Sequence, residues 1–431
     1  MHPMSELLQP KGVRDFSPKE KILRDRVIRT LTEQFERYGF NPLETPILER
    51  YEVLSAKYAG GAEILKETFR LTDQGERELG LRYDLTVPLA RFVAMNPNVK
   101  LPFKRYAIGT VYRDGPIKLG RYREFIQCDC DIVGADAPLA DAQCLQLALA
   151  AFDALAMGVT TTVNSVALLR LMLTVDGVAE ERLVETMLSL DKLKKIGEDG
   201  VVKELETAGI DGGVVRGIIA IAQLATTAER LAAVRERYGA TPELARLDET
   251  ISLVADERIV FDPSLSRGLS YYTGIVYETF LNDSQVTSSV SSGGRYDGMI
   301  GSFCERPGEY AAVGVSFGLE PIMDALALAG DTGRASVLDA YVIPIQTIRE
   351  SAEIAQKLRA VGVKTDVDLL GRGISKNLDY ANAMGAPFVI IVGRRELAEG
   401  KVKLKDMRSG EEELLSPEEL PGVVATRLSG A

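Results

Sequence analysis

The chain of 431 residues contains a single histidine, His2, close to its first residue. This scarcity excludes catalytic units that depend on imidazole, such as the Ser-His-Asp triad, the Cys-His dyad and histidine-ligated zinc. Catalysis must therefore rely on arginine, lysine, carboxylates, backbone amides and added metal ions. Such groups suit electrostatic catalysis on phosphates, where stabilising charge is most of the task.

Cysteine is also scarce, with four residues in the whole chain. This usage predicts a reducing compartment and hence a cytoplasmic location. Cys128 and Cys130 are two positions apart on a predicted strand, so their side chains should point to the same face. Neither a CxxC pair nor a histidine accompanies them, so we expect structural thiols rather than a metal site.

Long apolar runs are missing as well, since no stretch approaches the roughly 20 residues of a membrane span. Residues 1–11 lack the apolar segment of a secretion signal. A hydrophobic content of 46% with 26% charged residues indicates a soluble globular protein without a membrane partner. The length predicts two or three domains.

The net charge of −11 argues mildly against a nucleic-acid partner, although a local basic stripe is sufficient for one. Residues 100–123 supply such a stripe: Lys100, Lys104, Arg105, Arg113, Lys118, Arg121 and Arg123. The stripe fits either a solvated face or the wall of a channel for an anionic ligand. The apolar and glycine neighbours of several arginines favour the channel.

The order of predicted elements indicates two architectures in one chain. The first part has a helix at 19–38, a proline-interrupted strand at 40–48, strands at 67–71, 79–83, 103–112 and 125–133, a helix at 139–155, a mainly helical region at 166–254, and a strand and helix at 313–328. Closely spaced strands predict an antiparallel sheet. After a polar linker at 331–334, strands at 340–345, 363–367, 388–392 and 402–404 alternate with helices at 351–360 and 374–384, which predicts a small α/β domain.

Two runs rich in tyrosine and glycine predict the floor of a pocket. They are LSRGLSYYTG at 265–274 and GGRYD at 293–297. Glycine lets the backbone approach a ligand closely, and tyrosine offers a flat apolar face with a hydroxyl group. Arg267 and Arg295 each offer a planar fork for a carboxylate or phosphate. A β-core with buried tyrosines is the structural alternative.

The segment 112–134 reads YRDGPIKLGRYREFIQCDCDIVG, a strand with an arginine, a loop, and a returning strand. Arg113 is suited to grip a phosphate and a carboxylate, and the ring of Phe125 is suited to stack on a base. By alternation, Gln127 and Asp131 share the face of Phe125. Upstream, Asp84 in the run LRYDLT at 81–86 suits either an ammonium group or the start of a helix.

These segments together resemble the histidyl-tRNA synthetases, which are class II aminoacyl-tRNA synthetases. The segment 37–49 is similar to the family's motif 1, 112–134 to motif 2, and the two tyrosine-rich runs to its histidine-specific motifs. The resemblance implies an α+β catalytic domain with an antiparallel sheet at 1–165 and 255–330, a helical insertion at 166–254, and an α/β anticodon-binding domain at 335–431. It also implies a homodimer built on motif 1.

The resemblance assigns roles to residues of the motifs. Arg113 and Arg267 are implied to be catalytic, and Arg113, Arg121 and Phe125 to bind ATP. L-histidine is implied to contact Asp84, Thr86, Gln127, Asp131, Tyr271, Tyr272 and Tyr296. The reaction would join histidine to tRNA(His) with ATP as a substrate and Mg²⁺ on its phosphates, without a metal site made by the protein.

The chain departs from the family pattern at three places. Pro321 stands where motif 3 should carry an arginine that meets the γ-phosphate, Asp114-Gly115 stand where motif 2 should carry a glutamate, and Ser270 replaces an aspartate. Two alternatives therefore accompany the ligase: a non-aminoacylating, histidine-binding paralogue such as an ATP phosphoribosyltransferase regulatory subunit, and an unrelated ATP-dependent ligase. The α/β tail after Arg334 and the two tyrosine-rich runs favour the histidine ligase.

Overall fold

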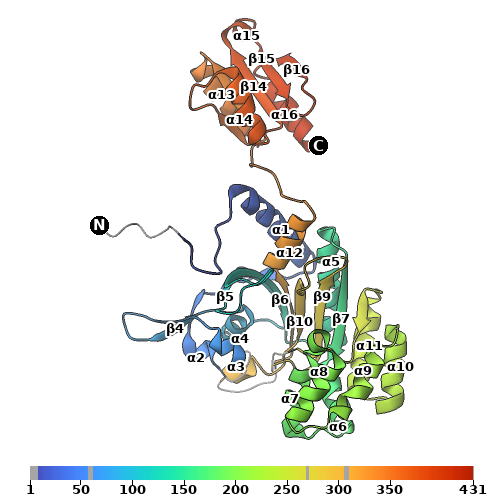
Figure 1. The fold of residues 1–431 in the computed structure, drawn as a ribbon. Coiled ribbons are helices and arrows are strands. Elements are labelled where there is room, and N and C mark those ends of the chain that lie inside the picture. Colours follow the sequence, from blue (N-terminus) through green and yellow to red (C-terminus); the bar gives the residue numbers. More distant parts are fainter. Residues whose placement is uncertain (1–7, 57–61, 268–270, 305–309, 431) are drawn as a thin grey trace. The chain divides into compact units, whose positions relative to one another are not determined.

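The computed structural model describes residues 8–56, 62–267, 271–304 and 310–430 (Figure 1). His2 and the residues Gly268, Leu269 and Ser270 of the tyrosine-rich run lie outside this described part. The chain separates into two compact units, residues 1–15 with 27–330 and residues 16–26 with 331–431. Each unit has its own sheet and core. Among the described helices, none combines the length and the apolar character needed to cross a membrane.

The first unit is built on an eight-stranded sheet with the order β1-β5-β6-β11-β10-β9-β7-β8. Its strands are β1 (Asn41–Pro42), β5 (Phe103–Tyr112), β6 (Glu124–Val133), β7 (Val159–Ser165), β8 (Ile259–Phe261), β9 (Ile275–Leu281), β10 (Ser291–Arg295) and β11 (Ala312–Gly318). The pairs from β5 through to β7 are antiparallel. The edge pairs β1–β5 and β7–β8 are parallel. The predicted antiparallel sheet is confirmed.

Strands β5 and β6 give the sheet two chemically different faces. Cys128 and Cys130 are both buried in the main core, on the same face, as their spacing predicted. That core also contains Leu31 and Phe35 of α1 (Pro18–Arg37) and one side of α5 (Pro138–Ala154). The opposite face of β6 carries the polar residues of the candidate site. The alternation along one strand therefore separates packing from chemistry.

The strands expected at 67–71 and 79–83 do not join this sheet, so that expectation was wrong. They form a separate three-stranded sheet, β2-β4-β3, with β2 (Leu48–Arg50), β3 (Arg70–Thr72) and β4 (Glu78–Leu81). Both edges of β4 are already paired, to β2 and to β3. A small core of Leu54, Tyr83 and Val87 lies beside it. The short helices α2 (Tyr51–Leu54) and α3 (Ala62–Lys66) and the helix α4 (Thr86–Met95) lie to one side of this sheet, and the end of β4 projects away from them (Figure 1).

A run of helices connects β7 to β8. It comprises α6 (Val166–Val175), α7 (Leu183–Leu190), α8 (Leu193–Thr207), α9 (Arg216–Ala222), α10 (Thr227–Tyr238) and α11 (Pro242–Val254). Figure 1 shows α6–α10 gathered below β7 and α11 beside α5. The chain leaves the sheet after β7 and returns as the neighbouring strand β8. The first unit ends with α12 (Leu319–Leu328), directly after β11.

The second unit is a five-stranded mixed sheet with the order β13-β12-β14-β15-β16. Its strands are β12 (Ala340–Ile345), β13 (Thr365–Val367), β14 (Phe388–Gly393), β15 (Val402–Asp406) and β16 (Glu412–Leu415), with helices α13 (Ile348–Ala360), α14 (Ile374–Ala383), α15 (Arg394–Ala398) and α16 (Leu420–Ser429). The α/β alternation is confirmed up to β15. β16 and α16 were not predicted from the sequence, although Leu420 and Val424 are buried in the core of this unit.

Candidate active site

A cavity of about 510 Å³ opens on the polar face of β6. It lies among the segment before α4, the loop between β5 and β6, and the strands β9, β10 and β11. All residues to which the resemblance assigned a role contribute to its lining: Asp84, Thr86, Arg113, Arg121, Phe125, Gln127, Asp131, Arg267, Tyr271, Tyr272 and Tyr296. Segments that are far apart in the chain therefore meet at one place.

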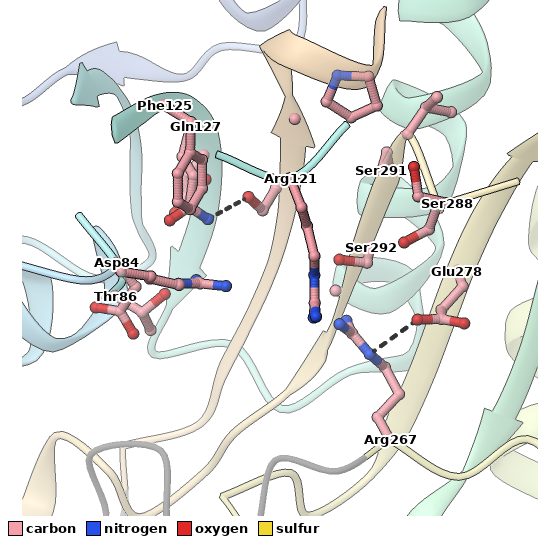
Figure 2. Close-up of a pocket in the computed structure, with 18 of the residues that line it drawn as sticks. Asp84, Thr86, Arg121, Phe125, Gln127, Arg267, Glu278, Ser288, Ser291 and Ser292 are labelled. Atoms are coloured by element: carbon pink, nitrogen blue, oxygen red, sulfur yellow. Dashed lines mark hydrogen bonds and ion pairs between the residues drawn. The ribbon is translucent and has the colours of Figure 1, made fainter. Parts of the chain in front are cut away.

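Arginines face this cavity from opposite sides. The Nε atom of Arg113 donates to the carbonyl of Tyr83 at 2.9 Å, and its guanidinium carbon lies 5.2 Å from the centre of the Phe125 ring. Across the cavity, Figure 2 shows Arg121 extending toward Arg267. The Nε atom of Arg267 is 3.4 Å from the carboxylate of Glu278. Anionic groups placed between these cations would be held from both sides.

Three tyrosines form an aromatic wall. The ring centres of Tyr271 and Tyr272 are 4.6 Å apart, and Tyr296 meets Tyr271 edge-on at 6.2 Å. A β-carbon on Gly294 would come within 2.9 Å of the Tyr272 ring, so glycine is needed at this position. The tyrosine-rich and glycine-rich runs thus depend on each other for packing. Their flat faces suit a planar ligand such as imidazole.

Two neighbouring side chains contact the carboxylate of Asp131. Its Oδ2 atom lies 2.7 Å from Nη2 of Arg105, which is 1% exposed, and its Oδ1 atom accepts from the Tyr296 hydroxyl at 2.5 Å. A β-carbon on Gly314 would approach Oδ1 to 2.0 Å, so only glycine leaves room for this carboxylate. The sequence placed Asp131 on the correct face but did not predict its partners.

Asp84 lies at the start of a helix and also lines the cavity. Its Oδ1 atom accepts from the backbone N–H of Val87 at 3.0 Å, in the first turn of α4, while the residue also lines the cavity. Thr86 opens the same helix. Burial raises the pKa of Asp84 to about 6, against the opposing effects of the Val87 hydrogen bond and of Arg113.

Several residues that line the cavity were not predicted from the sequence. Asp129 lies on the same face of β6 as Gln127 and Asp131, and alternation alone would have identified it. Burial raises its pKa to about 7. Ser316 on β11 accepts from Gln127 Nε2 at 2.8 Å. Ser288, Ser291 and Ser292 line the side opposite Phe125 (Figure 2), where no sequence signal pointed to them.

Three cations that the sequence placed near a ligand are engaged elsewhere. Arg295 is buried and binds Asp141 at 2.6 Å, so it holds β10 against α5 instead of facing the cavity. Lys104 donates to the Tyr38 carbonyl and to Gln143, on the opposite face of β5. Arg123 pairs with Asp114 at 2.9 Å. The basic stripe is therefore only partly a channel wall.

Pro321 lies in the first turn of α12 and also lines the cavity. The helix keeps its place because neighbouring carboxylates anchor it. Glu320 accepts from the backbone N–H of Ile126 at 3.0 Å, and Asp324 accepts from the backbone N–H of Gly120 at the same distance. The fold thus tolerates the proline, whereas the charge expected at this position is absent.

This sheet topology, with an arginine-lined cavity on its polar face and a separate α/β unit, defines a class II aminoacyl-tRNA synthetase. The family model of histidyl-tRNA synthetase matches residues 12–322, and that of the anticodon binding domain matches residues 339–427. The chain belongs to the histidyl-tRNA synthetase family.

Curated relatives and solved structures agree with this assignment. The chain is 44% identical over 415 residues to histidine–tRNA ligase 1 of Bacillus cereus, covering 94% of both chains. It is 41% identical to histidine–tRNA ligase of Aeropyrum pernix, covering 93% of this chain and 94% of that one. The structure of histidyl-tRNA synthetase from Nostoc sp. PCC 7120 matches with a TM-score of 0.86 and 29% identity, over 98% of this chain and 100% of that one.

A structure from Bacillus halodurans, described as an ATP phosphoribosyltransferase regulatory subunit/histidyl-tRNA synthetase, has a TM-score of 0.74 at 24% identity. It covers 88% of this chain and 97% of that one. At this identity the similarity shows the fold alone. Relatives named as ligases, together with the matched anticodon binding domain, support the ligase over the regulatory-subunit alternative.

Proposed function

We propose that this protein activates L-histidine with ATP and transfers the product to tRNA(His). The observation that carries the proposal is the meeting, in one cavity, of two facing arginines and a pocket of carboxylates and tyrosines. The arginines suit a phosphate group under attack, and the pocket suits an amino acid with an ammonium group and a planar side chain.

In the proposed first step, a carboxylate oxygen of histidine attacks the α-phosphorus of ATP. A carboxylate–phosphorus bond forms, the bond to the bridging oxygen breaks, and pyrophosphate leaves. The attacking carboxylate is already ionised at neutral pH, so no side-chain base is required. Arg113 and Arg267 would stabilise the charge that spreads over the phosphoryl oxygens.

ATP is proposed to lie with its adenine against Phe125 and its outer phosphates near Arg121. Lys118 lines the same cavity and adds a second cation. Mg²⁺ would be held mainly by the ATP phosphates, because Glu278, a carboxylate near Arg267, already pairs with that arginine. The ion would neutralise charge on the leaving pyrophosphate.

The domain boundaries and the cellular location are part of the same proposal. The catalytic domain would comprise residues 1–165 and 255–330, the helical insertion 166–254, and the anticodon-binding domain 335–431, which would contact the tRNA. The α/β order of β12–β15 supports the last of these. A cytoplasmic location follows from the few free thiols, three of which are buried.

Histidine-dependent exchange of label between pyrophosphate and ATP tests the proposal. We expect exchange at millimolar ATP with L-histidine, and none with glutamine or tyrosine. The KM for ATP should be high, because Pro321 removes a charge-assisted phosphate contact worth about 1.5–3 kcal/mol. Protein that binds histidine without supporting exchange would contradict the proposed ligase.

A homodimer is the second expected property. Ile47 and Leu48, in the motif 1 segment, are 42% and 48% exposed, and Leu71 on the same small sheet is 44% exposed. Apolar side chains gathered on one sheet suit a symmetric interface. Sedimentation should give twice the chain mass of 47.0 kDa.

Leu48→Glu should shift the protein toward the monomer, because it places a charge in the proposed interface. Val184→Glu is the matched control, since Val184 is also exposed but lies on α7 of the helical run. A wild-type protein that sediments at the single-chain mass at micromolar concentration would rule out the dimer.

A further inference from the structure

The β5–β6 loop, residues 113–123, carries two cations to the cavity. Lys118 and Arg121 both line it, and the backbone N–H of each donates to the carbonyl of the other, which closes a turn. Figure 2 shows Arg121 extending toward Arg267, so like charges face each other whenever no anion lies between them. The repulsion between them opposes this arrangement. Other contacts must therefore hold the loop in place.

The N-terminal segment, residues 10–14, packs against the returning side of this loop and belongs to the same compact unit. The backbone N–H of Arg123 donates to the carbonyl of Gly12 at 2.9 Å. Gly12 has a φ of +86°, and a β-carbon there would come within 2.8 Å of the Arg123 side chain and 2.9 Å of Ile117. Only glycine lets the segment and the loop approach this closely.

Arg14 of the same segment lies over the ring of Tyr122, the residue that follows Arg121. Its guanidinium carbon is 3.6 Å from the ring centre. The Tyr122 hydroxyl donates to Asp324 of α12 at 3.3 Å, and the same carboxylate oxygen accepts from the N–H of Gly120 at 3.0 Å. Burial raises the pKa of Tyr122, so its hydroxyl stays protonated and remains a donor. Tyr122 is thus held at its ring by one segment and at its hydroxyl by another.

We propose that the N-terminal segment positions the cations of the β5–β6 loop for the outer phosphates of ATP, with Arg14 as a positioning residue that acts through Tyr122. Arg14 is not among the residues that line the cavity, so its influence must pass through its neighbours. Cations that are already in place spare the reaction the cost of ordering them. The inference rests on the proposed function, because it requires ATP as the substrate.

Histidine-dependent exchange with full-length variants tests the role of Arg14. Arg14→Ala should raise the KM for ATP about two- to fivefold, the loss of one exposed contact between a cation and an aromatic ring. The KM for histidine and the melting temperature should not change. AMP lacks the outer phosphates, so its inhibition constant against ATP should also stay the same. Arg14→Lys keeps a cation over the ring and should resemble wild type.

Arg237→Ala is the matched control for Arg14→Ala. Arg237 also lies over a tyrosine ring, 5.3 Å from the centre of Tyr238, but on α10 of the helical run. It touches no residue of the β5–β6 loop among its described contacts. Its removal should leave the KM for ATP unchanged.

Two further variants follow the route from Arg14 to the loop. Gly12→Val places a side chain where Arg123 lies, so it should displace the loop and raise the KM for ATP by about 10- to 100-fold. The double variant Arg14→Ala/Tyr122→Leu should resemble Tyr122→Leu alone, because the ring through which Arg14 acts is already missing.

The outcomes separate the inference from the proposed function. Wild-type exchange together with an unchanged KM for ATP in Arg14→Ala would overturn the inference alone. Equal rises in the KM for ATP and for histidine would also overturn it, because they would indicate a general structural role. Additive effects of Arg14→Ala and Tyr122→Leu would show that Arg14 acts by another route. Wild-type protein without histidine-dependent exchange would overturn the proposed function.

Discussion

Replacing Arg267 by alanine is expected to slow histidine activation by about 100- to 1000-fold, the range for removing one pre-positioned donor from a reacting centre. Arg267 is held loosely, by contacts of 3.4 Å to Glu278 and to the Tyr272 hydroxyl. Among the residues that the structure describes, no other group binds its fork, which leaves donors for a phosphate. Because we place its contact on the α-phosphate, histidine affinity should change much less than the rate. Single-turnover kinetics and calorimetry measure the two quantities separately.

Two further variants test why activation slows in Arg267→Ala. Arg267→Lys keeps the charge without the planar fork and should fall between wild type and Arg267→Ala. Arg258→Ala removes one positive charge from the same unit, at a surface cluster with Asp153 and Asp256, and should leave activation unchanged. If Arg267→Ala weakened histidine binding as much as it slowed activation, the residue would serve substrate binding rather than the transition state.

Local patterns in the sequence were sufficient for much of the catalytic sheet. The expected strand 103–112 coincides with β5, and 125–133 with β6 to within one residue. Alternation along β6 put Phe125, Gln127 and Asp131 on one face because a strand has a period of two. The aromatic and glycine runs also pointed to one pocket, since few other segments combine these residue types.

The ion-pair partners of the buried arginines could not be predicted from such local patterns. Arg295 and Arg105 are both buried arginines in or near family motifs, yet the first pairs with Asp141 on α5 and the second with Asp131 on β6. Which acid each one meets depends on how strands distant in sequence are registered. For this reason the sequence could not predict that Asp131 is the carboxylate that pairs with Arg105.

Weak local signals explain the missed elements. β16 has the sequence EELL and pairs on one side only. Its positions alternate between exposed and half-buried, but polar and apolar residues do not alternate in its sequence. The segments of β3 and β4 have ordinary strand composition, and their separation from the main sheet follows from β4 pairing with both β2 and β3. Tertiary context decides such cases.

Arg105→Met is expected to lower the free energy of unfolding by about 3–5 kcal/mol, the usual cost of breaking a buried ion pair from one side. Arg105 is 1% exposed and also donates to the carbonyl of Leu85 at 3.0 Å. Its removal would leave the buried Asp131 carboxylate without a cation, beside Asp129 and Asp84. Urea denaturation gives the change in unfolding free energy directly.

The double variant Arg105→Met/Asp131→Asn identifies the cause of this loss. Asparagine removes the uncompensated charge but keeps an acceptor for the Tyr296 hydroxyl, so much of the stability should return. Arg235→Met is the matched control, because its ion pair with Asp248 is largely exposed and should contribute about 1 kcal/mol or less. If the double variant were as unstable as Arg105→Met, lost packing rather than unpaired charge would explain the effect. Arg105 would then matter for the shape of the site rather than for its charge balance.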